Sequence, residues 1–230
     1  MRVIAVATMK GGTGKTTTAA ALIAGATMKG LKVLGIDFDA QCNLTFIMGG
    51  TTEHGSILQG VNIQRTPAGD LAAGGMDIAT VEDLNALKNR LKIIKGYDLV
   101  IIDCPPNLGT PLGCAIRAAS EVLIPLQADS LSLQGLYQMY AAIRKANKDA
   151  QIAGVFLTRY NGRRIVSRDM AAAIQEQCEQ LHIPYLDTPI RECVAIPESQ
   201  VMQEDIFKYA PRSNAVEDYL ALMKVLKIRK

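Results

Sequence analysis

The stretch MKGGTGKTT at residues 9–17 has the residue types and the spacing of a phosphate-binding loop. Closely spaced glycines let a backbone curl around phosphate oxygens, Lys15 can neutralise the β- and γ-phosphates, and the Thr16 hydroxyl can bind Mg²⁺. An apolar run precedes the loop and an Ala-rich segment follows it, so the loop should open a helix whose N–H groups attract anions. The nucleotide site is predicted to contain Lys10, Gly11, Gly12, Thr13, Gly14, Lys15, Thr16 and Thr17.

The loop departs from the generic pattern at its first two positions. Met9 stands five places before Gly14, where the generic pattern has glycine, and Lys10 is an additional lysine. Because Lys15 occupies the inner side of the loop, a second ammonium group at its mouth is best placed to act on charge that arrives from outside.

Three aspartates at the ends of apolar runs are candidates for a magnesium site. Asp103 ends the run in YDLVIIDCPP, as a Walker B aspartate does, and Asp37 and Asp39 lie two residues apart in VLGIDFDAQCN. In an extended chain that spacing puts both side chains on the same side. Carboxylates beside phosphates and a metal ion can complete the metal shell or orient an attacking water, so we predict nucleotide hydrolysis.

The segment NKDA at residues 147–150 is close to the NKxD motif of guanine-specific proteins. Ala150 stands where that motif has aspartate, and the segment follows a predicted helix instead of a strand. Adenine is therefore favoured, and the expected cofactors are ATP and Mg²⁺.

Short apolar runs alternate with longer helical segments along the chain. The runs are continuous, as in strands buried on both faces, and cover residues 2–8, 32–37, 98–103, 121–126 and 152–158. Helices are predicted over residues 15–29, 81–94, 133–147, 165–181 and 214–227, with Gly30 ending the first. Residues 49–75 read as irregular, with a short strand at 61–64. The pattern predicts an α/β fold with a mostly parallel central sheet and helices on both faces.

Length and composition favour one globular domain over residues 1–230. Apolar residues make up 49% of the chain and charged residues 20%, with a net charge of +3. The first apolar run is too short for a signal peptide or a membrane span, so a cytoplasmic protein is expected. The five cysteines are an odd number without a CxxC pair, which indicates neither a disulfide framework nor a cysteine-rich metal site.

Five motifs in this order and spacing resemble those of ParA-type (Soj-like) partition ATPases, within the deviant Walker A group of P-loop ATPases. They are KGGTGKTT, DFDAQCN, IIDCPP, VLIPLQADSLSLQGL and YAPRSNAVEDYLAL, and they extend over essentially the whole chain. The resemblance implies that Lys10 reaches across a nucleotide-sandwich homodimer to the phosphates bound by the facing subunit. Hydrolysis and ATP-dependent dimerisation would then be one event.

The resemblance also implies roles for the three aspartates. Asp39 matches the carboxylate that positions the hydrolytic water, and Asp37 and Asp103 match residues near the magnesium ion. The switch segments would be residues 37–45 and 103–110. The expected catalytic residues are thus Lys10, Lys15 and Asp39, and the expected metal residues are Thr16, Asp37 and Asp103.

The sequence differs from the family pattern at a few positions. Ala40 replaces the proline of DxDPQ, which does not affect the chemistry. In PIRECVAIPESQ, Glu192 and Val194 replace an asparagine and an arginine, which leaves the adenine contacts open.

DNA is the partner that the resemblance implies for the ATP-bound dimer. Such dimers bind double-stranded DNA without sequence preference, through basic side chains that contact phosphates. The candidates here are Arg163, Arg164, Arg191 and Arg212, followed by Arg168, Lys208 and the terminal KVLKIRK. No helix-turn-helix is expected before the first strand, so sequence-specific operator binding is not expected.

The resemblance further implies a ParB-like, centromere-binding adaptor that stimulates slow hydrolysis. The expected location is the cytoplasm of a bacterium or archaeon, on the nucleoid. The cargo could be a plasmid, a chromosome, a mobile element or a protein cluster.

Three other classes of protein are alternatives. A MinD-like ATPase would use the same dimer switch on a membrane or position a protein cargo, but the terminal stripe Val216, Leu220, Met223 and Leu226 is more typical of a core-packing face. No stable membrane association is therefore expected. An iron–sulfur relative would need a local cysteine pair. A nonhydrolytic binding module is disfavoured by the presence of Lys15, Thr16, Asp39 and Asp103.

Overall fold

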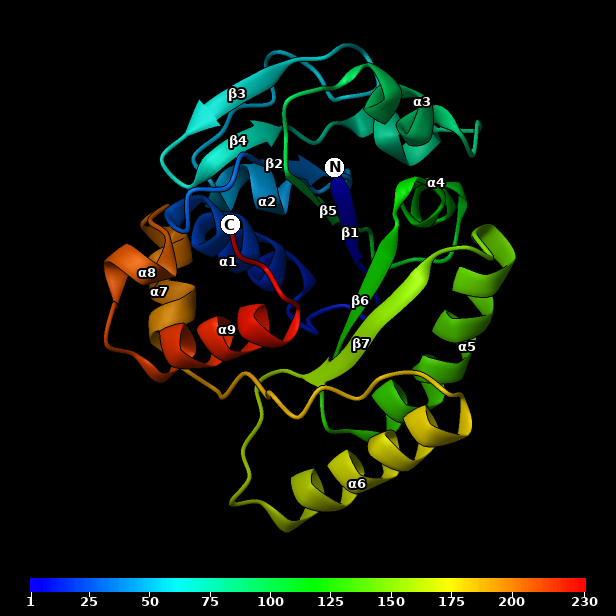
Figure 1. Ribbon diagram of the computed structural model, residues 1–230, viewed down its shortest axis with the longest axis vertical. Coiled ribbons are helices and arrows are strands. Elements are labelled where there is room, and N and C mark those ends of the chain that lie inside the picture. The colour runs from blue at the N-terminus through cyan, green and yellow to red at the C-terminus, as the bar shows by residue number, and fades with distance from the viewer.

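A seven-stranded sheet forms the centre of the computed structural model, which describes residues 1–230 (Figure 1). Its strands are β1 (Arg2–Val6), β2 (Val33–Asp37), β3 (Ile63–Thr66), β4 (Gly69–Ala72), β5 (Leu99–Asp103), β6 (Glu121–Leu126) and β7 (Gln151–Leu157). Their order across the sheet is β3-β4-β2-β5-β1-β6-β7. Every neighbouring pair is parallel except the β3–β4 hairpin, so the carboxyl ends of the six strands from β4 to β7 meet along one edge.

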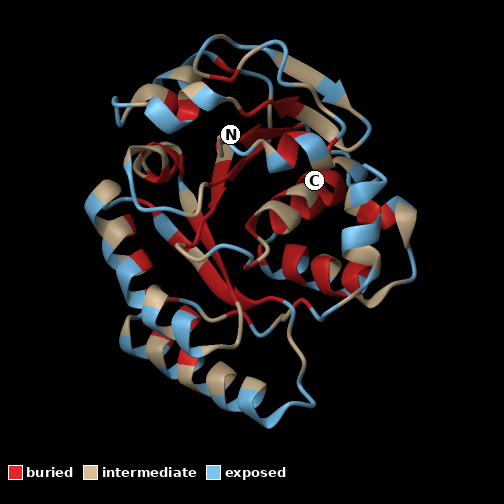
Figure 2. Ribbon diagram, turned by 180° about the vertical axis from the view of Figure 1, so that it is seen from behind, coloured by how far each residue is buried: buried red, intermediate tan, exposed pale blue.

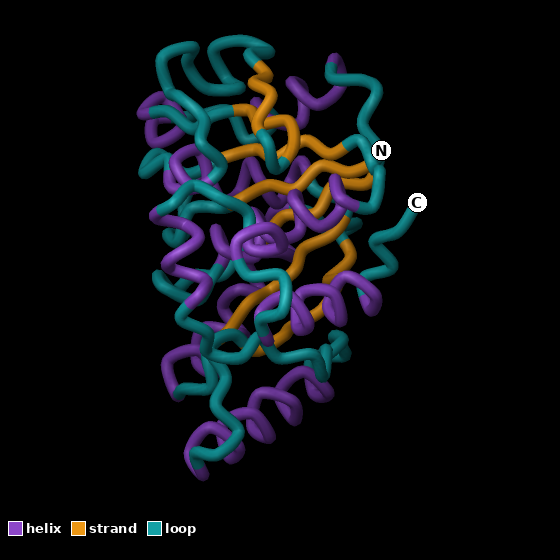
Figure 3. Tube along the Cα trace, turned by 90° about the vertical axis from the view of Figure 1, so that its left-hand side faces the viewer, coloured by secondary structure: helices purple, strands orange, loops and turns teal.

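Helices cover both faces of this sheet (Figure 3). They are α1 (Lys15–Met28), α2 (Asn43–Ile47), the 3₁₀ turn η1 (Met76–Thr80), α3 (Ala86–Ile93), α4 (Thr110–Ala118), α5 (Ser130–Ala146), α6 (Ile165–Gln180), α7 (Ala195–Val201), α8 (Ile206–Tyr209) and α9 (Asn214–Val225). None of these helices has both the length and the apolar content needed to cross a bilayer.

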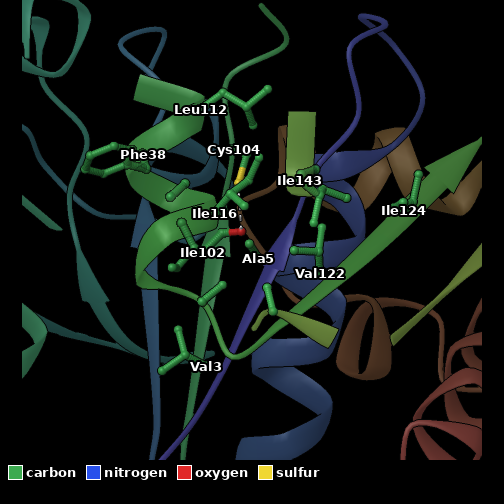
Figure 4. Close-up of a cluster of buried hydrophobic side chains, with 14 of the residues drawn as sticks. Val3, Ala5, Phe38, Ile102, Cys104, Leu112, Ile116, Val122, Ile124 and Ile143 are labelled. Atoms are coloured by element: carbon green, nitrogen blue, oxygen red, sulfur yellow. Dashed lines mark hydrogen bonds between the residues drawn. The ribbon is translucent and has the colours of Figure 1, made fainter. Parts of the chain in front are cut away.

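The two faces of the sheet have separate apolar cores, because successive side chains of a strand point to opposite faces. From β1, Val3 and Ala5 join the cluster under α3, α4, α5 and α6, whereas Ile4 and Val6 join the cluster under α1, α8 and α9. In Figure 4, Val3 and Ala5 lie with Ile102 of β5 in the first of these cores. Strands β1, β2, β5, β6 and β7 are buried along nearly their whole length, whereas β3 of the hairpin has no buried residue (Figure 2). Continuous apolar strands are thus explained by a sheet covered on both sides.

The predicted α/β fold is confirmed, and the five predicted apolar runs correspond to β1, β2, β5, β6 and β7, of which only β7 begins outside its run, one residue earlier. Gly30 has φ +81° directly after the last turn of α1, as a C-terminal glycine cap requires. The predicted helix at residues 81–94 begins later, at Ala86, because the Asn85 N–H bonds to the Asp83 side chain in a turn.

Several short elements were not predicted. The region 49–75 contains a whole hairpin, β3 and β4. Strand β3 begins and ends two residues later than the strand predicted at 61–64. Helices α2, α4, α7 and α8 have between 4 and 9 residues, too few to show a helical period in the sequence. Tertiary packing stabilises such short helices, so local sequence alone does not reveal them.

Candidate nucleotide-binding site

The loop between β1 and α1 forms an open cradle at the carboxyl edge of the sheet. Gly12 and Gly14 have φ +75° and +83°, a backbone conformation that a side chain strains. A Cβ atom added to Gly11 or Gly12 would meet no atom within 4 Å, so this side of the loop faces open space. Helix α1 starts at Lys15 without a side-chain cap and without an acidic residue in its first turn. Its first N–H groups are therefore available to an anion.

Lys15 lies inside this cradle with its side chain largely buried. Its Nζ donates to the Lys10 carbonyl oxygen at 3.3 Å, and the Thr13 hydroxyl donates to the same oxygen at 3.3 Å. Burial lowers the pKa of Lys15, while the negative charges of Asp103 and Asp39 act in the opposite direction. A buried ammonium group held only by a carbonyl oxygen gains strongly from a phosphate in reach.

Asp103 is fully buried at the end of β5, and neither of its carboxylate oxygens has a hydrogen-bond partner. It is paired in register with Val6 of β1 on one side and Asp37 of β2 on the other. Burial raises the pKa of Asp103 well above its ordinary value, and the neighbouring charge of Asp37 raises it further. Unpaired buried carboxylates are rare, and this one sits beside the phosphate loop.

Asp37 is also fully buried, but it is bonded. Its Oδ2 accepts hydrogen bonds of 2.7 Å from both the backbone N–H and the hydroxyl of Thr45, and its Oδ1 accepts from the Asp39 N–H at 3.3 Å. The Thr45 hydroxyl in turn accepts from the Gly74 N–H at 2.9 Å, which ties the ends of β2 and β4 together. Burial raises the pKa of Asp37 to about 6, although the bonds from Thr45 oppose this shift.

Asp39 lies in the turn after β2 and is half-buried. Strand β2 ends at Asp37, so the extended geometry behind the predicted placement of both side chains on one side stops there. One Asp39 carboxylate oxygen accepts from the Gln41 N–H at 3.0 Å, and the other makes no hydrogen bond. That oxygen is free to accept a bond from a ligand or a water.

These residues fit a magnesium ion beside a bound nucleotide. The decisive observation is the pair of orphaned oxygens of Asp103, which a divalent cation or its waters would satisfy. The Thr16 hydroxyl lies close enough to lower the pKa of Asp103 against the effect of burial. Thr16 and Asp103 would hold the ion, with Asp37 next to them in register. No group of three His, Cys, Asp or Glu side chains could hold a metal without such a nucleotide.

The sequence matches a family described as the CobQ/CobB/MinD/ParA nucleotide binding domain over residues 4–206. The chain belongs to this family. It is 32% identical to the sporulation initiation inhibitor protein Soj of Bacillus subtilis, over 97% of each chain. It is 30% identical to the chromosome-partitioning ATPase Soj of Thermus thermophilus, over 100% of this chain and 96% of the other.

Solved structures of this family share the fold. The cell division ATPase MinD of Pyrococcus furiosus superposes with a TM-score of 0.83 at 26% identity and 98% coverage of each chain. Cobyrinic acid a,c-diamide synthase of Mycobacterium smegmatis, solved with ADP and magnesium, superposes with a TM-score of 0.74 at 31% identity, over 88% of this chain and 92% of the other. The predicted ParA/MinD-type P-loop ATPase is thus confirmed as to family, fold and enzyme class.

Several residues that support the P-loop of this ATPase were not predicted. The buried Thr158 hydroxyl at the end of β7 donates to the Thr13 carbonyl at 2.8 Å, and Gln127 donates to the Gly12 carbonyl at 2.8 Å. From α7, Gln200 donates to the Thr17 hydroxyl at 2.8 Å. All three lie more than 100 residues from the loop, so no local pattern could connect them to it. Only the position of Thr158 and Gln127 at strand ends was a usable signal.

Lys10, the additional lysine of the loop, contacts a side chain of its own chain in this structure. Its Nζ forms an ion pair of 2.5 Å with Asp129, the N-terminal cap of α5. The side chain therefore lies at the rim of the cradle and not inside it, and its expected action on a facing subunit stays a prediction.

The four arginines predicted to bind DNA differ in their surroundings. Arg163 and Arg164 are exposed in the turn between β7 and α6, and Arg212 is exposed before α9. None of these three forms an ion pair within the chain. Arg191 instead forms ion pairs of 2.6 Å with both Asp218 and Glu217, so its charge is already balanced.

Proposed function

We propose that this protein is an ATP-dependent partition ATPase whose ATP-bound form is a sandwich homodimer that binds double-stranded DNA without sequence preference. A ParB-like adaptor stimulates its slow hydrolysis, and the cycle segregates a plasmid, a chromosome or a mobile element. The proposed active unit is one domain over residues 1–230, located on the nucleoid. The observation that carries this proposal is the near full-length similarity to Soj proteins, together with Lys10 in the loop.

The residues of the site support hydrolysis of a nucleotide in the following way. The N–H groups at the start of α1 and the Lys15 ammonium bind and orient the phosphates. The free carboxylate oxygen of Asp39 accepts a hydrogen bond from the attacking water and orients it. A magnesium ion held by Thr16 and Asp103 would neutralise charge that develops on the phosphate oxygens. Lys10 supplies a further positive charge to the nucleotide of the facing subunit.

Free arginines support the proposed binding of DNA. Phosphate contacts need exposed positive charges, and Arg163, Arg164 and Arg212 have them. Arg191 is a weaker candidate, since a phosphate would have to displace Asp218 and Glu217.

Binding to unrelated linear duplex DNA with ATP, ADP or no nucleotide tests this function. Asp39→Ala traps the ATP state, and we expect DNA binding with ATP only, weakening as salt rises. Arg163→Ala with Arg164→Ala should weaken binding about equally on every sequence and reduce the salt slope by about 1 for each phosphate that is no longer neutralised. The matched control is Lys145→Ala with Lys148→Ala, which removes two exposed charges at the C-terminal end of α5 and should leave binding unchanged. A trapped dimer that ignores DNA would contradict the proposal.

The alternative function is a MinD-like ATPase that switches on a membrane or positions a protein cargo. The structural similarity to MinD favours it, but α9 does not offer a free apolar face. Of the predicted stripe, Val216, Met223 and Leu226 are buried in the core that also contains residues of α1, and Leu220 is half-buried against it. Sedimentation of the trapped protein with anionic vesicles distinguishes the two functions, and we expect the protein to stay in the supernatant.

An iron–sulfur carrier is disfavoured by the same structure. Cys104 and Cys114 have no exposed surface, so two copies could not share a cluster between these thiols without rearrangement.

A further inference from the structure

The ion pair between Lys10 and Asp129 joins the P-loop to the start of α5 in the same chain. Nζ of Lys10 lies 2.5 Å from Oδ2 of Asp129, and Oδ1 of Asp129 accepts from the Ser132 N–H at 2.8 Å. Burial raises the pKa of Asp129, but the hydrogen bonds from Lys10 and Ser132 lower it more, so it lies below its ordinary value. The carboxylate is therefore charged and holds the ammonium group near its own subunit.

The backbone of Lys10 is held separately from its side chain. The Lys10 carbonyl oxygen points into the cradle, where it accepts from Thr13 and Lys15. Gln127, two residues before Asp129, ties the same connection to the Gly12 carbonyl. Rotation about the bonds of the Lys10 side chain is thus enough to move the ammonium group, and neither loop has to shift.

We propose that Asp129 is a positioning residue for Lys10, which it holds in cis in the monomer and releases when a second copy presents its nucleotide phosphates. This inference rests on the proposed ATP-dependent homodimer. After Lys10 is released, the Asp129 carboxylate still accepts the hydrogen bond from the Ser132 N–H. The triphosphate that attracts Lys10 carries more negative charge than one carboxylate, so the exchange favours the dimer when ATP is bound.

The free energy of the Lys10–Asp129 ion pair determines how much this pair raises the dimer dissociation constant. Both side chains are about one-third exposed, at 32% and 34%, so water screens the pair. A pair of this kind changes an equilibrium by about 1.5- to 5.5-fold. Because each dimer breaks two such pairs, the dimer dissociation constant should change by the square, about 2- to 30-fold.

Asp129→Asn is the test, in the Asp39→Ala background with ATP and Mg²⁺. Asparagine keeps the N-terminal cap of α5, so the variant loses the charge without losing the helix start. The matched control is Asp205→Asn, because Asp205 also caps a helix, α8, and pairs with a lysine, Lys208, at 3.2 Å. We expect Asp129→Asn to lower the dimer dissociation constant about 2- to 30-fold in sedimentation velocity, and Asp205→Asn to leave it unchanged. An unchanged or weaker dimer in Asp129→Asn overturns the proposal.

A second measurement uses the nucleotide-free monomer and does not depend on the dimer. The Lys10 side-chain NH₃⁺ signal, assigned with Lys10→Arg, should show slow proton exchange in ¹⁵N NMR and lose it in Asp129→Asn. An identical signal in both proteins overturns the hold on Lys10. If the Asp39→Ala parent itself does not dimerise with ATP, the proposed function fails first, and that outcome differs from a parent dimer that Asp129→Asn does not change.

Discussion

Charged groups at the amino ends of the strands are paired with one another, whereas buried charged groups at the carboxyl ends lack such partners. At the amino edge, Arg2 of β1 donates two hydrogen bonds of 2.6 Å to Glu121 of β6 and a third of 2.7 Å to the Leu226 carbonyl. The Ser120 hydroxyl bonds both the N–H and the carbonyl of Val3. At the carboxyl edge, Asp103 has no partner and burial shifts the pKa of Asp37 and Lys15 against their charged forms.

This difference teaches how the fold separates stability from function. Paired charges at the amino edge stabilise the protein by themselves, whereas unpaired charges at the carboxyl edge cost stability until a ligand balances them. Parallel α/β sheets bind ligands at the carboxyl edge, and in this chain the buried charged groups without a partner lie at that same edge. Substitutions at the two edges should accordingly have opposite effects.

The largest effect is expected for Lys15→Ala at the carboxyl edge. Loss of the ammonium group inside the cradle should reduce ATP hydrolysis by at least about 100-fold. The thermal stability of the nucleotide-free protein should not fall, because burial of this charge is unfavourable. ATPase assays and thermal melts of the same preparations check both results. Retained hydrolysis, or a clear drop in melting temperature, would contradict the contrast between the edges.

The next effect concerns pH and Asp37. Its pKa of about 6 in the fold lies above that of the unfolded chain, so between about pH 4 and 6 the native state binds more protons than the unfolded state. The free energy of unfolding should therefore fall as pH rises through this window, by up to about 3 kcal/mol from Asp37. Asp37→Asn should remove this part of the slope, as urea unfolding of the nucleotide-free protein at several pH values would show. A variant with the same slope as the parent would be evidence against it.

At the amino edge, Arg2→Met should reduce stability without reducing hydrolysis. It leaves the carboxylate of Glu121 without its partner and removes the bond to Leu226, and the expected loss is about 1–2 kcal/mol because the pair is partly exposed. Urea unfolding measures the loss, and the double variant with Glu121→Gln measures the coupling of the pair. A fall in ATPase activity greater than the loss of folded protein would refute the separation of the edges.

The smallest effect is expected for Thr158→Val, which sharpens the comparison within the carboxyl edge. The change keeps the shape of the buried side chain but removes the hydroxyl that bonds the carbonyls of Thr13 and Leu126. We expect a loss of about 1 kcal/mol in stability and a rise of a few-fold in the Michaelis constant for ATP. Thr158→Ser, which keeps the hydroxyl, is the control. Equal behaviour of the two variants would show that the hydroxyl does not hold the loop.

The sequence by itself determined the parts whose signal is local. A glycine loop between an apolar strand and a helix needs only neighbouring residues, so the cradle of Lys15 and Thr16 was predictable. The same holds for the five buried strands and for Asp103 at the end of one of them, because both faces of a covered parallel strand are apolar.

Only the tertiary structure decided which of these groups meet. The order β2-β5-β1 places Asp103 between Asp37 on one side and the strand that leads into the loop on the other, although the two aspartates lie 66 positions apart in the chain. The pairs Lys10–Asp129 and Arg191–Asp218 join residues 119 and 27 positions apart, and they decide whether each cation is free. Pairing of side chains depends on packing between distant elements, and hydrophobic periodicity carries information about burial but none about which charges will face each other.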